Sequence, residues 1–195
     1  MIGLLIVCAS FFICYIVEKL TNVKPTIDFK NKFEYLPILT ANIYADLFII
    51  YIAFSSKYFK SFKLENWYKK YRLSAMIADI LIGVLYMLLG RYLVYSLKIK
   101  VSLTVFAFIC VIIQLIFDVL FYLLFSLIPL GRNNMLDFFK SYAKEVGVNA
   151  LIGDSVLVIL AVVLSALLNA RSFDTNIVLL ILGVYLAPYF IYMKD

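Results

Sequence analysis

The sequence contains no histidine among its 195 residues. This absence excludes imidazole catalysis, zinc or haem sites with histidine ligands, and switches driven by histidine protonation. Cysteine is scarce as well: Cys8, Cys14 and Cys110 each lie in an apolar stretch. An odd number of thiols in such surroundings gives neither a disulfide framework nor metal-ligand spacing. We therefore expect three buried small side chains, and no metal or cofactor.

Charge is also sparse, since 15% of the residues are charged and 65% are hydrophobic. The mean hydropathy of +1.01 lies outside the range of soluble globular domains. The first apolar run is followed by Glu18 and Lys19 instead of a small-residue cleavage site, so we interpret it as a membrane anchor. The sequence predicts an all-α integral membrane protein, one transmembrane domain over residues 1–195. Runs long enough to span a bilayer occupy residues 2–17, 36–55, 73–96, 101–129, 147–170 and 176–193.

The net charge of +6 comes from residues in the connections between these runs. Segment 56–72, SKYFKSFKLENWYKKYR, alternates cations with aromatic rings, and segment 133–146, NNMLDFFKSYAKEV, has the apolar spacing of a helix that lies on a membrane. This mixture is typical of headgroup surfaces and favours contact with anionic lipid or a protein partner over nucleic acid. The predicted contact residues are Lys57, Lys60, Lys63, Trp67, Lys69, Lys70, Arg72, Phe138, Phe139 and Lys140.

Loop charges leave the orientation in the membrane open. The second and fourth loops and the C-terminus hold ten Lys and Arg residues, against seven in the first, third and fifth loops. This difference favours cytoplasmic termini, whereas the basic residues that follow the first run favour the reverse.

Several short patterns occur twice. SAMIAD (74–79) is matched by NALIGD (149–154), and WYKKY (67–71) by FFKSY (138–142). Upstream of each, an amide precedes an aspartate by four residues, so that the two share a helix face: Asn42 with Asp46, and Gln114 with Asp118. The pattern predicts two duplicated parallel-repeat hairpins, 36–97 and 101–172. The anchor helix with its loop (1–35) and the last helix (173–195) then pack outside this four-helix core.

Four aspartates fall inside predicted spans, at estimated depths of about 9 to 17 Å below one face. An ionised aspartate in hydrocarbon costs at least about 2.5–3.5 kcal/mol, so the four should face the bundle interior. We expect Arg91 to reach the far interface with Lys98 and Lys100 instead of pairing with them. The predicted intramembrane polar or ion site consists of Asp46, Asp79, Asp118, Asp154, Asn42 and Gln114.

This polar layer has three interpretations. The acids are protonated and join the helices by hydrogen bonds, or they hold a hard cation together with the two amides, or they line a wet path for protons or cations. Intramembrane aspartyl proteolysis needs paired motifs that the sequence lacks, so we expect no enzyme.

Residues 135–163, MLDFFKSYAKEVGVNALIGDSVLVILAVV, together with LIGVLYMLLGRYLVY (81–95), resemble an uncharacterised multi-pass membrane protein family of large nucleocytoplasmic DNA viruses that infect algae and amoebae. The resemblance covers about a quarter of the chain, and its most specific part runs from Phe138 to Asp154. It implies a protein of an infected cell, carried in the lipid layer beneath an icosahedral capsid.

The two function hypotheses belong to different classes. The first is a structural protein of the virion's internal membrane that contacts the capsid shell, as a minor capsid or membrane protein and possible homo- or hetero-oligomer. The alternative is a small channel or transporter that moves cations or protons through the aspartate layer.

Overall fold

The computed structural model describes residues 2–55 and 62–193, which are helical apart from short connections. Among these residues, six helices are long and apolar enough to cross a membrane, as the sequence predicts. The two short helices α3 and α6 are amphipathic segments that connect consecutive spans. In chain order the elements are α1 Ile2–Thr21, η1 Lys32–Glu34, α2 Tyr35–Ser55, α3 Phe62–Tyr71, α4 Leu73–Leu97, α5 Leu103–Leu127, α6 Asn134–Val146, α7 Val148–Asn169 and α8 Phe173–Ile191.

Side-chain caps set several helix starts. The hydroxyl of Ser102 accepts a hydrogen bond from the backbone N–H of Val105 at the start of α5. The hydroxyl of Ser172 likewise accepts a hydrogen bond from the backbone N–H of Thr175. Helix α8 starts at Phe173, three residues before the predicted boundary at 176. Such caps satisfy N–H groups that have no partner within the helix. They explain why the observed and predicted spans differ by only a few residues.

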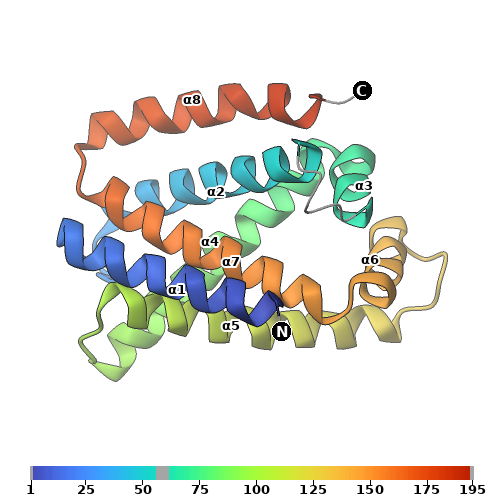
Figure 1. The fold of residues 1–195 in the computed structure, drawn as a ribbon, viewed down its shortest axis with the longest axis horizontal. Helices are drawn as coiled ribbons and strands as arrows, with labels where there is room; N and C mark the ends of the chain where they lie inside the picture. Colours follow the sequence, from blue (N-terminus) through green and yellow to red (C-terminus); the bar gives the residue numbers. More distant parts are fainter. Residues whose placement is uncertain (1, 56–61, 194–195) are drawn as a thin grey trace.

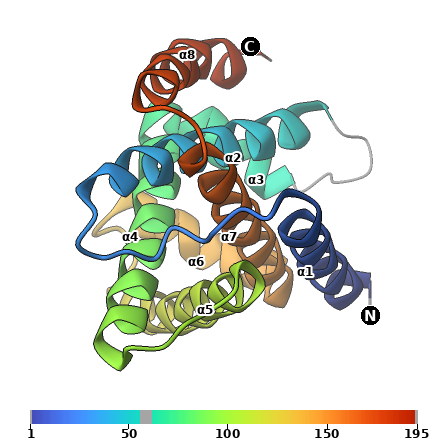
Figure 2. The same cartoon turned by 90° about the vertical axis from the view of Figure 1, so that its left-hand side faces the viewer.

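Four spans form a ring and two lie outside it. Helix α2 packs against α4 and α7, and α5 closes the ring by packing against the same two helices. Helix α8 covers the outer side of α2, and α1 lies along α7 and α5 (Figures 1 and 2). The first and last spans thus lie outside the ring in this structure.

Glycines allow close approach within the ring. A β-carbon on Gly83 of α4 would lie 2.2 Å from Oδ1 of Asn42 on α2. A β-carbon on Gly90 would lie 3.0 Å from Sγ of Cys110 on α5. Lipid tails are as apolar as the side chains, so no hydrophobic driving force brings helices together in a membrane. Small residues at the interface instead allow close van der Waals packing. Helix α4 therefore uses two glycines to contact both of its neighbours in the ring.

Two of the three cysteines are buried, and the third is not. Cys14 and Cys110 are fully buried. Cys8 is exposed, so the prediction that it is buried is wrong. The reason is that α1 is an outer helix, and only one of its faces contacts the ring.

The prediction for Arg91 is also wrong. Its side chain is fully buried, and Nη2 lies 3.2 Å from Oε2 of Glu34. The connection between α1 and α2 folds over the end of α4, where the carbonyl groups of Asp28 and Asn31 also accept hydrogen bonds from Nη2. The ring of Tyr35 lies 4.9 Å from the guanidinium carbon. This loop brings an acid and carbonyl groups to the arginine, so the side chain does not extend to the far interface.

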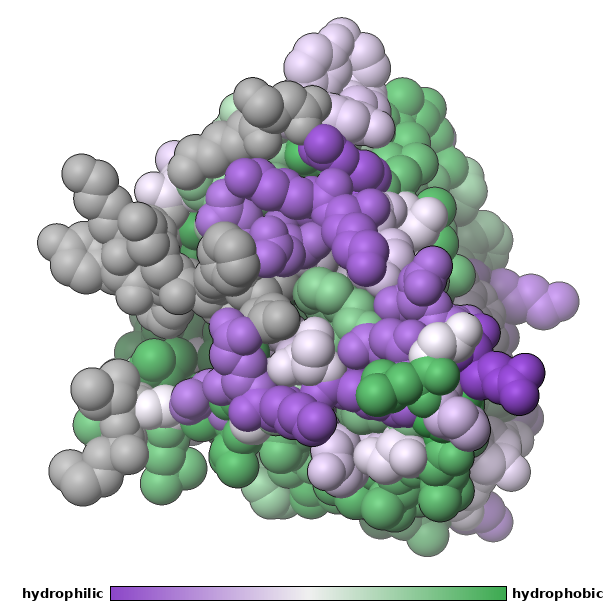
Figure 3. Space-filling view, turned by 90° about the vertical axis from the view of Figure 1, so that its right-hand side faces the viewer, coloured by the Kyte–Doolittle hydropathy of each residue, from purple (hydrophilic) through white to green (hydrophobic). Residues whose placement is uncertain are grey.

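The opposite end of the bundle carries α3 and α6. Helix α8 ends near α3, and α1 starts at its own end nearer to the two short helices (Figure 1). Seen from there, hydrophilic side chains gather over the end while hydrophobic ones form the flanks (Figure 3). This contrast is expected where a bundle leaves the hydrocarbon region.

A candidate carboxylate site beneath two short helices

Each ring helix contributes one aspartate near the end that α3 and α6 cover. Asp46 and Asp118 precede the last residues of α2 and α5 by nine positions. Asp79 and Asp154 follow the first residues of α4 and α7 by six positions. These offsets correspond to about 14 Å and about 9 Å along the helices. The four acids therefore lie at similar depth, as the sequence predicts.

Asp46 and Asp79 share one phenol. The hydroxyl of Tyr68 on α3 lies 2.8 Å from Oδ1 of Asp46 and 3.0 Å from Oδ2 of Asp79. The indole N–H of Trp67 donates to the same oxygen of Asp79 at 2.9 Å. Asp46 is 1% exposed, and its second oxygen, Oδ2, has no hydrogen-bond partner. Two neighbouring side chains of α3, Trp67 and Tyr68, thus bind acids from two different spans.

The Tyr68 phenol is a lasting donor in this arrangement. Tyr68 is 1% exposed and belongs to α3, outside the spans. Burial raises the pKa of its hydroxyl well above the ordinary value, and the carboxyl groups of Asp46 and Asp79 raise the pKa further. The phenol therefore keeps its proton throughout the physiological pH range.

Asp118 has different partners. The hydroxyl of Tyr86 on α4 donates to Oδ1 at 3.0 Å, and the side-chain amide of Gln114 donates to Oδ2. The hydroxyl of Ser155 on α7 lies 2.8 Å from the carbonyl oxygen of Gln114, which fixes the orientation of the amide. The predicted association of Gln114 with Asp118 is confirmed.

Asn42 does not join the acids. Its side-chain N–H group donates to the carbonyl of Ile38 at 2.8 Å and contacts the sulfur of Met87 at 3.5 Å. It is packed against Gly83, one helical turn away from Asp46. The prediction that Asn42 contributes to a site with the aspartates is wrong, because the interface between α2 and α4 takes up the amide.

Asp154 is the most open of the four acids. It is exposed, while the other three are buried or half-buried. No hydrogen bond or ion pair links it to another described residue, although Asp118 and Asp79 are close enough to influence it electrostatically. Tyr142 of α6 is half-buried beside the same acids; burial raises the pKa of its phenol, and Asp154 adds to that effect. Asp154 is therefore an acid near two others that makes no hydrogen bond or ion pair with a described residue.

The basic side chains that the structure describes leave this group of acids without an ion pair. Among the described residues, none of the four aspartates forms an ion pair with a Lys or Arg side chain. Within the same residues, no three acidic or thiol groups come close enough together to hold a metal ion. The arrangement can bind protons, and it has the oxygen ligands to attract a small cation, but it is not a preformed divalent-metal site.

Helices α3 and α6 cover the acids through an aromatic cluster. The ring of Trp67 lies 4.9 Å from Tyr71, 5.5 Å from Phe138 and 4.8 Å from Phe139, measured between centroids. Phe139 continues the cluster to Phe121 of α5 at 5.2 Å. Trp67 is 4% exposed. These rings join the two short helices to each other and to the bundle.

One predicted surface contact is consequently wrong: Trp67 is buried, because the apolar faces of α3 and α6 turn toward each other and the bundle. Phe138 and Phe139 are half-buried in the aromatic cluster, so their contact with a membrane surface or partner stays a prediction. Lys140 is half-buried and donates to the carbonyl of Ile128 beyond the end of α5. A ring beside a lysine in sequence indicates the membrane interface, but does not decide which way the ring points.

The remaining predicted contacts have mixed positions. Lys70 is exposed. Nζ of Lys69 lies 2.9 Å from Oε1 of Glu65, one helical turn earlier. The guanidinium carbon of Arg72 lies 4.7 Å from the ring of Tyr192 after α8. Lys57 and Lys60 lie outside the described residues, and so does the side chain of Lys63.

Sequence reasoning missed the side chains that bind the acids. Tyr68, Tyr86 and Ser155 donate hydrogen bonds to the polar layer from three different helices. Tyr86 has one sequence signal, a hydroxyl near the middle of an apolar span. Tyr68 has none, because it occurs among many aromatic residues in segment 56–72.

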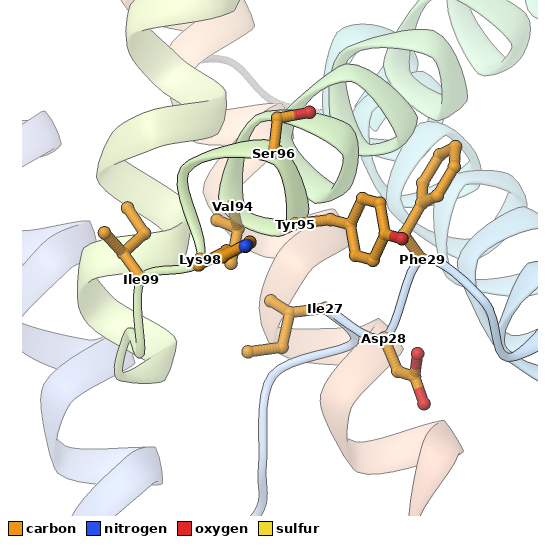
Figure 4. Close-up of a pocket in the computed structure, with 8 residues that line it drawn as sticks. All are labelled: Ile27, Asp28, Phe29, Val94, Tyr95, Ser96, Lys98 and Ile99. Atoms are coloured by element: carbon orange, nitrogen blue, oxygen red, sulfur yellow. The ribbon is translucent and has the colours of Figure 1, made fainter.

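An open pocket lies at the other end of the bundle. It is formed by residues 27–29 of the first connection and by the end of α4 with the residues that follow it (Figure 4). The ring of Tyr95 stacks on Phe29 with 5.5 Å between centroids, and Asp28 is the one acid in its lining. The pocket is separate from the aspartates and brings together no reactive group.

Comparisons with protein-family models, with curated proteins and with solved structures each returned no match to this chain.

Proposed function

We propose that this multi-pass membrane protein transfers protons or small cations through its aspartate layer. The observation that carries the proposal is Asp154, an exposed acid that has no hydrogen-bond or ion-pair partner among the described residues and lies at the depth of three other acids. An unpaired aspartate in a span costs at least about 2.5 kcal/mol, and acids in such places mark ion pathways and proton relays. A side chain that served only to join helices would have found a partner, as Asp118 does.

The partners of the other acids support protons over a divalent ion. Asp79 and Asp118 each accept two hydrogen bonds from neutral donors. These bonds occupy oxygen atoms that a divalent ion would need, since calcium takes six to eight oxygen ligands. Protons need only one oxygen lone pair at each step.

Flux in liposomes tests this function. The purified chain is reconstituted with a pH-sensitive dye inside the vesicles, and a potassium diffusion potential drives proton entry. We expect Asp154→Asn and Asp79→Asn to lower the initial rate at least about tenfold, which corresponds to 1.36 kcal/mol on the barrier. Asparagine keeps the shape of the side chain and removes its ionisation.

Asp174→Asn is the matched control, because Asp174 is an exposed acid in the first turn of α8. We expect this variant to keep the full rate. The same vesicles loaded with sodium- or potassium-sensitive dyes identify a carried cation. The proposal fails if the unaltered protein moves none of these ions, or if the two aspartate variants move them at the full rate.

We further infer that the two halves of the ring are copies of one unit. Both run from span to amphipathic helix to span, as α2–α3–α4 and α5–α6–α7. The equal offsets of the aspartates from the helix ends support this inference. Two units with the same orientation around one site are a common plan among transporters.

A structural role in a virion is the second candidate. The hydrophilic end of the bundle supports it, because charge belongs where a membrane protein meets a shell or anionic lipid (Figure 3). Lys70 of α3 is exposed and can contribute to such a contact. The resemblance of residues 135–163 to a viral family adds the internal membrane of the particle as the location.

Peptide mass spectrometry on purified particles of the encoding virus tests this second candidate. We expect the chain at a fixed ratio to the major shell protein, in amounts that stay constant between preparations. Trace amounts that vary with residual host membrane would contradict a structural role and leave ion transfer as the function.

A further inference from the structure

Two ionised carboxylates around Tyr68 would be poorly stabilised. A phenol has a single hydrogen to donate, and an ionised carboxylate can only accept. Yet the hydroxyl oxygen of Tyr68 is within hydrogen-bond distance of both Asp46 and Asp79, at 2.8 Å and 3.0 Å. Two ionised acids would share that one hydrogen and repel each other, whereas a protonated carboxyl group supplies a second hydrogen and removes the repulsion.

The environment of the two acids decides which one carries that hydrogen. Asp79 Oδ2 accepts from the indole of Trp67 at 2.9 Å as well as from the phenol, so a negative charge there is stabilised twice. Asp46 is 1% exposed, contacts only the phenol, and leaves Oδ2 buried without a partner. A buried charge with an unpartnered oxygen is strongly disfavoured. The neutral acid is thus Asp46.

We propose that Asp46, Tyr68 and Asp79 form a proton-holding site in which Asp46 is protonated, donates to the phenol oxygen, and is connected through Tyr68 to Asp79. The role of this site in proton transfer rests on the proposed function. Its existence depends only on the hydrogen-bond donors and acceptors around Tyr68.

The same three groups can pass the proton without moving heavy atoms. The O–H bond of Asp46 breaks as its hydrogen joins the Tyr68 oxygen, and the original phenol hydrogen leaves for Oδ2 of Asp79. Asp46 becomes a carboxylate, Asp79 becomes a neutral acid, and the trio keeps a net charge of minus one throughout. Asp79 lies close enough to Asp154 to interact with it electrostatically. The charge on Asp79 therefore influences the exposed acid.

Titratable groups from two other helices interact with Asp79. Tyr142 on α6 and Asp154 on α7 lie close enough to do so electrostatically. One is neutral and the other acidic, and among the described residues no Lys or Arg side chain forms an ion pair with Asp46 or Asp79.

The second half of the ring lacks the equivalent donors. By the sequence match of WYKKY with FFKSY, Phe138 and Phe139 occupy the positions of Trp67 and Tyr68. A phenyl ring offers neither N–H nor O–H, and Asp154 correspondingly has no hydrogen bond to a described residue. The proton-holding site therefore exists in the first half only.

Infrared spectroscopy of the full chain in lipid tests the site directly. A protonated carboxyl group absorbs at a higher frequency than a carboxylate, and exchange into D2O shifts its band. At mildly alkaline pH we expect the unaltered protein to show a protonated-carboxyl band that is missing in Asp46→Asn. Tyr68→Phe should raise the frequency of this band because the bond to the phenol is lost.

Tyr71→Phe is the matched control on the same helix, because the Tyr71 hydroxyl donates to the carbonyl of Asn134, 2.7 Å away, instead of to an acid. We expect its band to be unchanged. If the unaltered protein shows no protonated carboxyl band, or if Asp46→Asn leaves the band in place, the site is refuted even when ions are transported. If the band behaves as expected while flux is absent, the site stands and the proposed transport fails.

Flux adds a readout specific to the relay. If transport is present, Tyr68→Phe should lower its rate at least about tenfold, at the low end of what a positioned proton-transfer group contributes. A full rate in Tyr68→Phe would show that protons bypass the phenol and would overturn the relay.

Discussion

Glu34→Gln is expected to destabilise the folded protein by about 3–5 kcal/mol, the usual cost of removing one partner from a buried ion pair. Glu34 and Arg91 are both buried, and their charged atoms lie 3.2 Å apart. Glutamine keeps the size of the side chain and an oxygen that can accept the N–H of Asp28, which lies 3.2 Å from the glutamate. What is lost is the charge that balances the guanidinium.

The guanidinium of Arg91 has little else to compensate. Its Nε and Nη1 atoms are buried without hydrogen-bond partners, so Nη2 makes all of its polar contacts. Carbonyl groups of the first connection remain near Nη2 in the variant, but they carry only partial charge. The uncompensated cation should therefore loosen the loop that joins α1 to α2.

Unfolding in mixed micelles, titrated with a denaturing detergent, measures the loss. Lys69→Gln is the control, because it removes an exposed pair at one-turn spacing and should cost at most about 0.5 kcal/mol. Replacing both partners, Glu34→Met with Arg91→Met, should recover most of the stability, since an apolar pair leaves no buried charge. Equal costs for Glu34→Gln and Lys69→Gln would contradict the buried pair.

Trp67→Ala is expected to cost about 3–5 kcal/mol, the range for truncating a buried aromatic side chain. The indole ring is 4% exposed and contacts rings on both α3 and α6. Its removal leaves a cavity between the two short helices and takes the N–H donor from Asp79. Both effects should detach α3 from the bundle.

Trp67→Phe separates the two effects. Phenylalanine keeps a ring in the aromatic cluster and removes only the N–H. We expect the free energy of unfolding to fall by about 1–3 kcal/mol, the usual loss when a buried acceptor has no donor. The same detergent titration gives the free energies. Limited trypsin cleavage after Lys69 and Lys70 reports on α3, and it should be fast in the alanine variant and slow in the phenylalanine variant. Equal stability of Trp67→Ala and the unaltered protein would refute the buried position of the ring.

The spans were predictable because each one is decided locally. About twenty apolar residues satisfy their own backbone hydrogen bonds in lipid whatever their neighbours are, so the run 73–96 becomes α4 Leu73–Leu97 with almost the predicted bounds. The depth of the acids followed from the same regularity, since position along a straight helix is a matter of counting. The partners of the acids did not follow. Tyr68 reaches Asp46 only because α3 folds under the end of the bundle.

Directions of side chains were the least predictable feature. Arg91 has the composition of an interfacial residue, yet a connection some sixty positions earlier in the chain folds over it and supplies Glu34. Trp67 lies among lysines and still turns inward, because the apolar face of α6 is available to cover it. A sequence window contains neither neighbour, so it cannot decide between lipid and protein as the surroundings of a ring.

The sequence by itself determined that this chain is a membrane protein of six apolar helices, and that four aspartates lie at similar depth within them, because hydrophobicity and helical rise act residue by residue. Tertiary structure alone decided that Asp46 and Asp79 share the hydroxyl of Tyr68, that Arg91 is paired with Glu34, and that Asp154 has no hydrogen-bond or ion-pair partner among the described residues. Those contacts join residues from different helices, and their energies depend on packing that exists only when the whole bundle has formed.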